Sequence, residues 1–159
     1  MIMKRSKEDN RGFSLIELVI VMVIMAMLVG IVGIYIFPYM RKSKEARDVQ
    51  KMSAYCTDAM NAYISSAEKL DEKKIYTITV TKGSPKWRVD AKDNNGTEVE
   101  SLKNEFVAFN QLDTNAPEFE SKEGQKINKI SIQCKNGTPS VLLTVEGPED
   151  ASIFTVEAK

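Results

Sequence analysis

The sequence has no histidine and only two cysteines, Cys56 and Cys134. Histidine is the commonest general base and metal ligand near neutral pH, so its absence removes the usual basis for an enzyme or a metal centre. The two cysteines form no C-x-x-C pair, which leaves zinc binding and thioredoxin-like chemistry without support. Lysine plus arginine number 22, as do aspartate plus glutamate, and this balance does not indicate a nucleic-acid partner. We therefore expect no catalytic residue, no metal and no cofactor.

Charge is also missing from one long segment. No charged side chain occurs from Leu18 to Met40, a run longer than the ~20 residues that a helix needs to cross a bilayer. A secretory signal peptide would have a shorter apolar region followed by small residues, whereas bulky residues occupy positions 34–37 here. An uncleaved membrane anchor fits the length of the run, and the buried helix of a soluble protein does not.

Glu17 lies just before this uncharged run, inside the apolar segment that begins at Phe13. A carboxylate at the centre of a spanning helix costs ~2.5–3.5 kcal/mol, and less near its end, so such a residue usually has a function and a partner. The segment itself offers no cationic partner. Cleavage between Gly12 and Phe13 would create an α-amino group four residues before Glu17 in every copy. In a staggered bundle, the amine of one copy would then meet the carboxylate of another.

Residues 11–18, which read Arg-Gly-Phe-Ser-Leu-Ile-Glu-Leu, follow a basic leader and open a long apolar run. This arrangement resembles the class III signal of type IV prepilins and of the related pseudopilins. The resemblance implies cleavage after Gly12 by prepilin peptidase, N-methylation of Phe13, and a role for Glu17 in subunit assembly. It also implies that the N-terminus faces the cytoplasm and the rest of the chain lies outside.

The function that the resemblance implies is structural. The chain would be a subunit of a type IV pilus, held in the cytoplasmic membrane before assembly. It would then polymerise with copies of itself, through the assembly platform and with minor pilins, into a surface fibre for adhesion, motility or aggregation. A pseudopilin of a type II secretion or competence system is the nearest alternative. A singly anchored binding or sensor domain is the alternative from another class.

Beyond Pro38, apolar residues recur in steps of three and four from Val49 to Leu70, which predicts an amphipathic helix. We expect one long helix from about Phe13 to Leu70, with a kink, break or hinge around Gly30, Gly33 and Pro38. Its opposite, solvated face is expected to carry Lys44, Arg47, Asp48, Lys51, Asp58 and Glu68. The basic residues just past the apolar run are Arg41, Lys42, Lys44, Arg47 and Lys51. Because of them the positive-inside rule gives no clean orientation and leans slightly towards the opposite one. We interpret them as a solvated face; acidic surface on a neighbouring subunit is the alternative.

The remaining residues are rich in predicted strands. Alternation predicts strands at 74–81, 85–89, 127–135, 140–146 and 152–157, and helical spacing predicts a helix at 98–112. The last three strands are expected to form an antiparallel meander. The fold class is therefore α+β, with the long helix packed on an antiparallel sheet, and the resemblance implies that this is the type IV pilin fold. Its expected parts are a leader (1–12), a transmembrane half-helix (13–37), an amphipathic half-helix (38–72) and a strand-rich head (73–159).

Cys56 lies on the apolar stripe of the helix, and Cys134 lies near the end of a strand expected to cover that stripe. A disulfide that joins helix and sheet is one interpretation, and two buried free thiols are the other. Many pilins instead close a loop in the C-terminal half with a disulfide. The first cysteine of this chain lies in the predicted helix, so the resemblance does not imply a receptor-binding loop here. The acidic residues at 146–150 lack the alternating pattern of a calcium loop.

Overall fold

The computed structural model describes residues 14–71, 73–83, 86–110, 117–135 and 140–158. It has two compact units, Met1–Met40 and Arg41–Lys159, each of which is considered by itself below. The first unit contains the N-terminal part of helix α1. The second contains the rest of α1, a second helix and a sheet. Gly12 and Phe13 lie outside the described residues, as does the Asn136-Gly137 turn.

Helix α1 runs from Leu15 to Ser65, including the turn around Pro38. In the second unit its buried apolar residues are Met52, Cys56, Ala59 and Ala62, which repeat every three or four positions as the sequence predicts. The helix ends before the predicted Leu70, and a short 3₁₀ turn, η1 (Ala67–Lys69), follows. Two consecutive serines, Ser65 and Ser66, stand at this end, where short polar side chains compete with helical hydrogen bonding.

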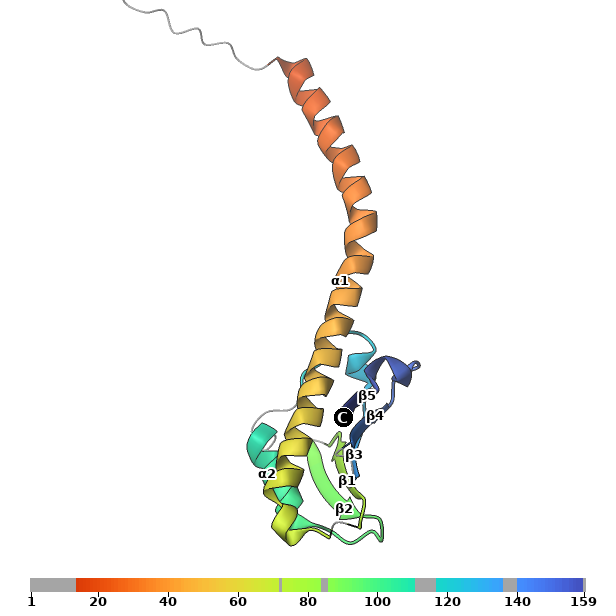
Figure 1. Cartoon of the computed structure of the whole chain (residues 1–159). Helices are drawn as coiled ribbons and strands as arrows, with labels where there is room; N and C mark the ends of the chain where they lie inside the picture. Colours follow the sequence, from red (N-terminus) through yellow and green to blue (C-terminus); the bar gives the residue numbers. More distant parts are fainter. Residues whose placement is uncertain (1–13, 72, 84–85, 111–116, 136–139, 159) are drawn as a thin grey trace, which may run out of the picture. The chain divides into compact units, whose positions relative to one another are not determined.

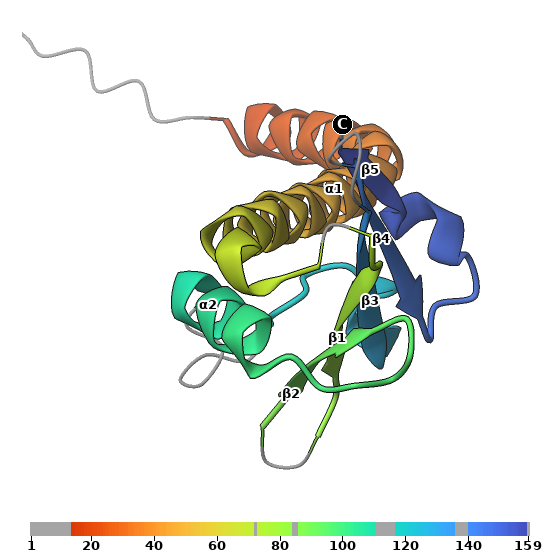
Figure 2. The ribbon, with the colours of Figure 1, turned by 60° about the horizontal axis from the view of Figure 1, so that its bottom comes forward.

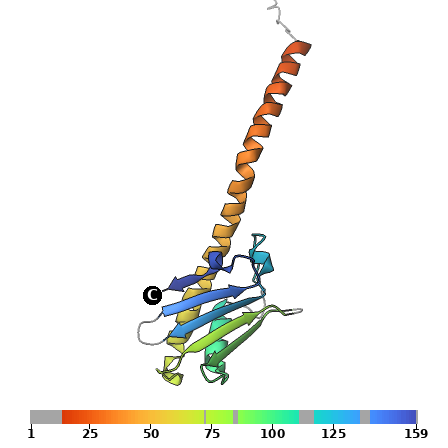
Figure 3. The same ribbon diagram turned by 90° about the vertical axis from the view of Figure 1, so that its right-hand side faces the viewer.

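Five antiparallel strands form one sheet, in the order β2-β1-β3-β4-β5 (Figure 3). The strands are β1 (Tyr76–Thr81), β2 (Arg88–Asp93), β3 (Lys129–Lys135), β4 (Ser140–Glu146) and β5 (Val156–Ala158). Helix α2 (Glu100–Asn110) follows β2 in the chain (Figure 1). Strands β3, β4 and β5 form the predicted antiparallel meander. The α+β architecture is confirmed.

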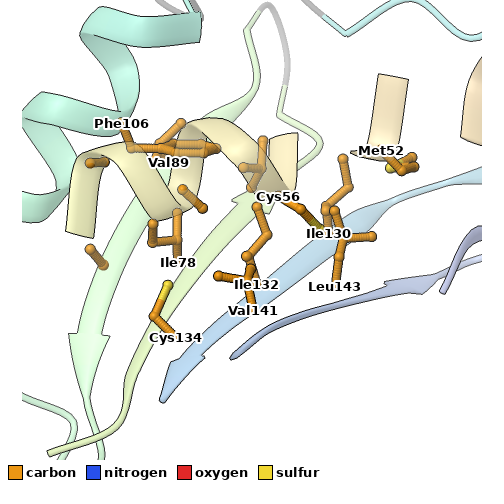
Figure 4. Packing of buried hydrophobic residues seen from close by; sticks show 14 of the residues in the cluster. Met52, Cys56, Ile78, Val89, Phe106, Ile130, Ile132, Cys134, Val141 and Leu143 are labelled. Atoms are coloured by element: carbon orange, nitrogen blue, oxygen red, sulfur yellow. The ribbon is translucent and has the colours of Figure 1, made fainter. Parts of the chain in front are cut away.

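One face of the sheet carries the core. Ile78 pairs with Ala91 on one side and with Ile132 on the other, and Ile132 pairs with Leu143, so their side chains share one face. The C-terminal part of α1 and helix α2 cover that face (Figure 2). Phe106 of α2 joins the same cluster, with its ring 6.5 Å from that of Tyr55 (Figure 4). Each fully buried apolar side chain contributes roughly 1.5–3 kcal/mol.

Two strand predictions were misplaced. Strand β2 begins at Arg88 rather than at position 85, and it extends to Asp93 through a segment that looks too charged for a strand. Its inward positions are Val89, Ala91 and Asp93, and this last carboxylate is buried because it has hydrogen-bond donors around it. The segment from Ser152 was predicted as strand, but residues Ala151–Phe154 form the 3₁₀ turn η3. The side chain of Asp150 accepts the backbone N–H of Ser152 at 3.2 Å and starts this turn.

Candidate functional site

The first turn of α1 contains a local hydrogen-bond arrangement that the sequence analysis missed. The backbone N–H of Ser14 donates to Oε2 of Glu17 at 2.9 Å. The N–H of Leu18 donates to the carbonyl of Ser14 at 3.2 Å, which makes Ser14 the residue that caps the helix. The pattern S-x-x-E before an apolar run is the sequence signature of a capping box, in which the glutamate reaches back to the capping residue's own N–H. That signal was readable in Ser14-Leu15-Ile16-Glu17.

Glu17 therefore has a hydrogen-bond partner within its own segment, although this partner is a neutral amide and not a cation. The negative side chain also lies at the positive end of the helix dipole, which lowers the cost of its charge. An ionised carboxylate has about four acceptor positions, and among the described residues Ser14 provides the only hydrogen bond to it. Glu17 is exposed, so most of its accepting capacity is open to a donor from elsewhere.

The apolar side chains of the first unit are exposed almost throughout. Leu15 is 79% exposed, Ile34 74% and Tyr39 75%, and none of the large apolar residues between them is buried. Within the part of the chain that the structure describes, α1 is the one helix long and apolar enough to cross a membrane. A contiguous apolar surface of this size requires lipid or other protein around it. The helix fits anchoring in a membrane.

Gly30, Gly33 and Pro38 all lie inside α1, and the helix is not broken at any of them. A side-chain carbon built on Gly30 would meet no atom within 4 Å, and one on Gly33 would lie 3.9 Å from Cε2 of Phe37. Neither glycine is therefore required by a close approach of other atoms in this structure. The break expected at Pro38 is absent. Whether the segment acts as a hinge stays a prediction.

Asp48 was expected on the solvated face of α1, but it is fully buried. Its two carboxylate oxygens accept the backbone N–H groups of Glu120 and Ser121 at 2.9 and 2.8 Å. Gly124 lies directly against this carboxylate, where a larger residue would collide with Oδ2 of Asp48. Charge-assisted hydrogen bonds of this kind offset the cost of burying a carboxylate. The segment 118–124 is thereby fixed to α1.

Two of the basic residues after the apolar run also contact this segment. Arg47 donates to Glu120 at 3.0 Å, and Lys51 donates to the backbone carbonyl of Glu118 at 2.5 Å. Arg47 and Lys51 thus have partners within the chain. The interpretation of the basic residues as a solvated face did not include these contacts. Exposed contacts of this kind, of which Arg47–Glu120 is an ion pair, contribute ~0–1 kcal/mol each. They orient the segment more than they stabilise it.

Cys56 and Cys134 are free thiols, and both are buried. The sequence left open a disulfide between helix and sheet or two buried free thiols, and the structure has the free thiols. Both side chains belong to the core cluster, Cys56 from α1 and Cys134 from β3 (Figure 4). Burial raises the pKa of the Cys56 thiol to about 11 and that of Cys134 to about 12. Both groups are therefore protonated and poorly nucleophilic at neutral pH.

The described residues contain no group of cysteine, aspartate and glutamate side chains that could hold a metal ion. In the acidic segment 146–150, Asp150 caps η3 and Glu149 pairs with Lys126 at 3.1 Å. These carboxylates therefore have partners within the chain. Trp87 is half-buried and packs edge-on against Phe119, with ring centroids 6.5 Å apart.

The comparison with protein families identifies the N-terminal segment. The prokaryotic N-terminal methylation motif matches residues 9–33, which include the expected cleavage site and Glu17. The chain carries a class III signal of the prepilin type. The prepilin-type signal marks a precursor that is pilin-like or a pseudopilin. Comparisons with curated proteins and with solved structures gave no match.

Proposed function

We propose that this chain is the precursor of a type IV pilus subunit. Prepilin peptidase cleaves it between Gly12 and Phe13 and the new N-terminus of Phe13 is methylated. The subunit is stored in the cytoplasmic membrane with its N-terminus inside, and the assembly platform then polymerises it, with minor pilins, into a surface fibre. The observation that carries this proposal is an apolar helix with exposed side chains that follows a prepilin-type signal and begins with a hydrogen-bonded carboxylate.

The exposed helix supports polymerisation as well as storage. Leaving lipid for water would expose the whole apolar surface, at about 25 cal/mol per Å². Leaving lipid for a bundle of identical helices exchanges one apolar environment for another, so the transfer costs far less. Residues 13–37 would therefore be the transmembrane and polymerisation segment. Residues 38–72 would connect it to the head formed by residues 73–159.

Glu17 has the chemistry that matching between copies requires. Its hydrogen bond with Ser14 uses part of its accepting capacity, and a free amine on another chain's Phe13 would use the rest. In the apolar interior of a bundle, an unpaired charge is strongly disfavoured, so a mismatched stagger would be penalised. We propose that Gly30, Gly33 and Pro38 let the helix bend as it packs, since glycine and proline weaken this stretch.

Processing is the first test. The chain is expressed with and without a prepilin peptidase, and the mature N-terminus is sequenced. We expect N-methylated Phe13 at the N-terminus only when the peptidase is present. Gly12→Val should block cleavage by crowding the scissile bond, while Gly30→Val, where the added side chain meets open space, should not. An intact leader under both conditions would refute the proposal.

Assembly is the second test, and it separates a pilus subunit from a pseudopilin. Surface fibres are sheared from cells and probed for this chain. Glu17→Ala should be cleaved normally yet give few or no fibres. Normal fibres from Glu17→Ala would contradict the role of Glu17. Correct processing without any surface fibre in cells that express the complete machinery would favour a pseudopilin.

A further inference from the structure

A groove lined largely by charged residues lies at the first turns of α1 beyond its uncharged run. It has a volume of about 210 Å³ and lies entirely within the second unit. Arg41, Lys44 and Glu45 of α1 line one side, and residues 120–123 line the other. Asp48, one turn further along the helix, fixes residues 120 and 121 in place through its two hydrogen bonds. The hydrogen bonds of Asp48 therefore hold the two sides of the groove together.

The carboxylates on the far side of the groove are already paired. Glu120 interacts with Arg47 at 3.0 Å and with Lys51 at 3.9 Å, and Glu123 interacts with Lys126 at 2.9 Å. Among the described residues, no carboxylate lies within ion-pair distance of the three cations of the groove, Arg41, Lys44 and Lys122. Glu45 is the one lining carboxylate without a cationic partner there. The lining has as many carboxylates as cations, but two of the three carboxylates already have partners, so Arg41, Lys44 and Lys122 are left to contact an external anion.

The position of the groove along the chain indicates where that anion comes from. Arg41 follows Met40, the last residue of the uncharged run. Exposed Tyr35 and Tyr39 stand near the end of the run, where aromatic side chains commonly mark the boundary between lipid and water. In a chain that the uncharged run holds in a membrane, residues that directly follow this run in the sequence would lie among the lipid head groups, and Arg41 and Lys44 are such residues.

We propose that this groove binds the phosphate of an anionic phospholipid head group while the subunit is stored in the membrane. Arg41, Lys44 and Lys122 are the contacting cations. The inference rests on the membrane storage in the proposed function. It accounts for four of the five basic residues that follow the apolar run: Arg47 and Lys51 hold the segment 118–124, and Arg41 and Lys44 bind lipid. Basic residues beside a membrane attract anionic lipids in proportion to their number.

Nuclear magnetic resonance of the full chain in maltoside micelles tests the proposal. The backbone amides of residues 120–123 are followed while dioctanoyl phosphatidylglycerol, dioctanoyl phosphatidylcholine or inorganic phosphate is added. We expect saturable shifts with phosphatidylglycerol, and at least about tenfold weaker effects with the other two. Equal binding of inorganic phosphate would overturn the assignment to lipid.

Two triple variants make the test specific. Arg41→Gln, Lys44→Gln and Lys122→Gln together should weaken the phosphatidylglycerol effect at least about tenfold. The control carries the same loss of charge at three exposed lysines outside the groove, as Lys69→Gln, Lys92→Gln and Lys135→Gln. Circular dichroism shows whether both variants fold. A control that binds as weakly as the groove variant would reduce the effect to general charge attraction.

The remaining outcome concerns contacts between copies. If the groove variant binds lipid normally but loses crosslinking between subunits, the groove contacts an acidic surface on another copy, and the lipid proposal is wrong. Cleavage by prepilin peptidase is measured on the same variants. Normal cleavage with no lipid effect would overturn this inference alone, whereas failed cleavage of the unmodified chain would overturn the proposed function.

Discussion

The Ser14 amide and the Glu17 carboxylate close the first turn of α1 through a hydrogen bond of 2.9 Å. The residue expected to match subunits thus also holds the start of its own helix. These two roles need different properties of the side chain. Holding the turn requires an acceptor of the right length, whereas pairing with an amine in an apolar bundle requires a negative charge. Glutamine has the acceptor without the charge, so it separates them.

Glu17→Gln should preserve the first turn, and Glu17→Ala should weaken it by about 0.5–1 kcal/mol, a typical value for a lost cap. The measurement is hydrogen exchange at the Ser14 amide of the processed chain in micelles. Exchange should be close to that of the unmodified chain in the glutamine variant, and roughly two- to fivefold faster in the alanine variant. Both variants should lose fibre assembly. Identical exchange in all three chains would show that the hydrogen bond does not form in a lipid-like environment.

Asp48→Ala should destabilise the head by about 2–4 kcal/mol, because the buried N–H group of Ser121 and the partly buried N–H group of Glu120 lose their acceptor. Urea unfolding followed by the fluorescence of Trp87 measures this change. Trp87 is the single tryptophan and packs on Phe119, so it reports on this segment directly. Asp58→Ala is the matched control on the same helix. Burial raises the pKa of the Asp58 carboxyl, which means that its surroundings disfavour the charged form. Asp58→Ala should therefore not lower the free energy of unfolding. Equal losses in the two variants would contradict the role of Asp48.

The outcome at Asp48 shows where the sequence is informative about this fold and where it is not. The apolar stripe on α1 was predictable because residues three and four positions apart share a helix face whatever surrounds them. Strand β4, whose bounds were predicted correctly, has a similarly local pattern. The burial of Asp48 depends on N–H groups more than seventy residues away, in a segment without periodic pattern. No local signal distinguishes such an aspartate from a solvated one.

The candidate site likewise has features that a local sequence pattern reveals and features that depend on distant segments. The methylation motif and the S-x-x-E pattern are local, and both can be read directly from the sequence. The groove beside Arg41 requires segments 41–45 and 120–123 to come together, and the pairing of Glu120 and Glu123 decides its charge. Counting basic residues after the apolar run could not separate the cations that hold a segment from those that remain available.

The two thiols should resist modification in the folded chain. Burial raises their pKa values to about 11 and 12, so the thiolate that reacts is scarce at pH 8 and is also inaccessible. Reaction with a disulfide reagent should be negligible over minutes in the native chain and should give two thiols per chain in denaturant. Cys134→Ala should reduce the second value to one. If no thiol reacts in denaturant without a reductant, the chain has a disulfide after all.

Acid should weaken the head partly through Asp93. Its side chain is 3% exposed and accepts from Lys74 at 2.8 Å and from the backbone N–H groups of Asn95 and Thr97. The hydrogen bond from Lys74, followed by that from Thr97, lowers the pKa of the Asp93 carboxyl to about 2. A folded pKa below the unfolded value of about 3.9 means that the unfolded chain binds the proton first as the pH falls. The stabilisation is therefore complete above about pH 4 and is lost as the pH falls towards 2.

Asp93→Asn isolates this contribution. The variant should be less stable than the unmodified chain at pH 7, and the difference should shrink between pH 4 and pH 2 as the native carboxyl is protonated. Urea midpoints from Trp87 fluorescence at pH 7, 4, 3 and 2 provide the comparison. Glu123→Gln is a useful second variant, since Lys126 also lowers the pKa of the Glu123 carboxyl and adds to the acid dependence at a separate place. Parallel loss of stability in the unmodified chain and in Asp93→Asn would show that Asp93 does not contribute to the acid transition.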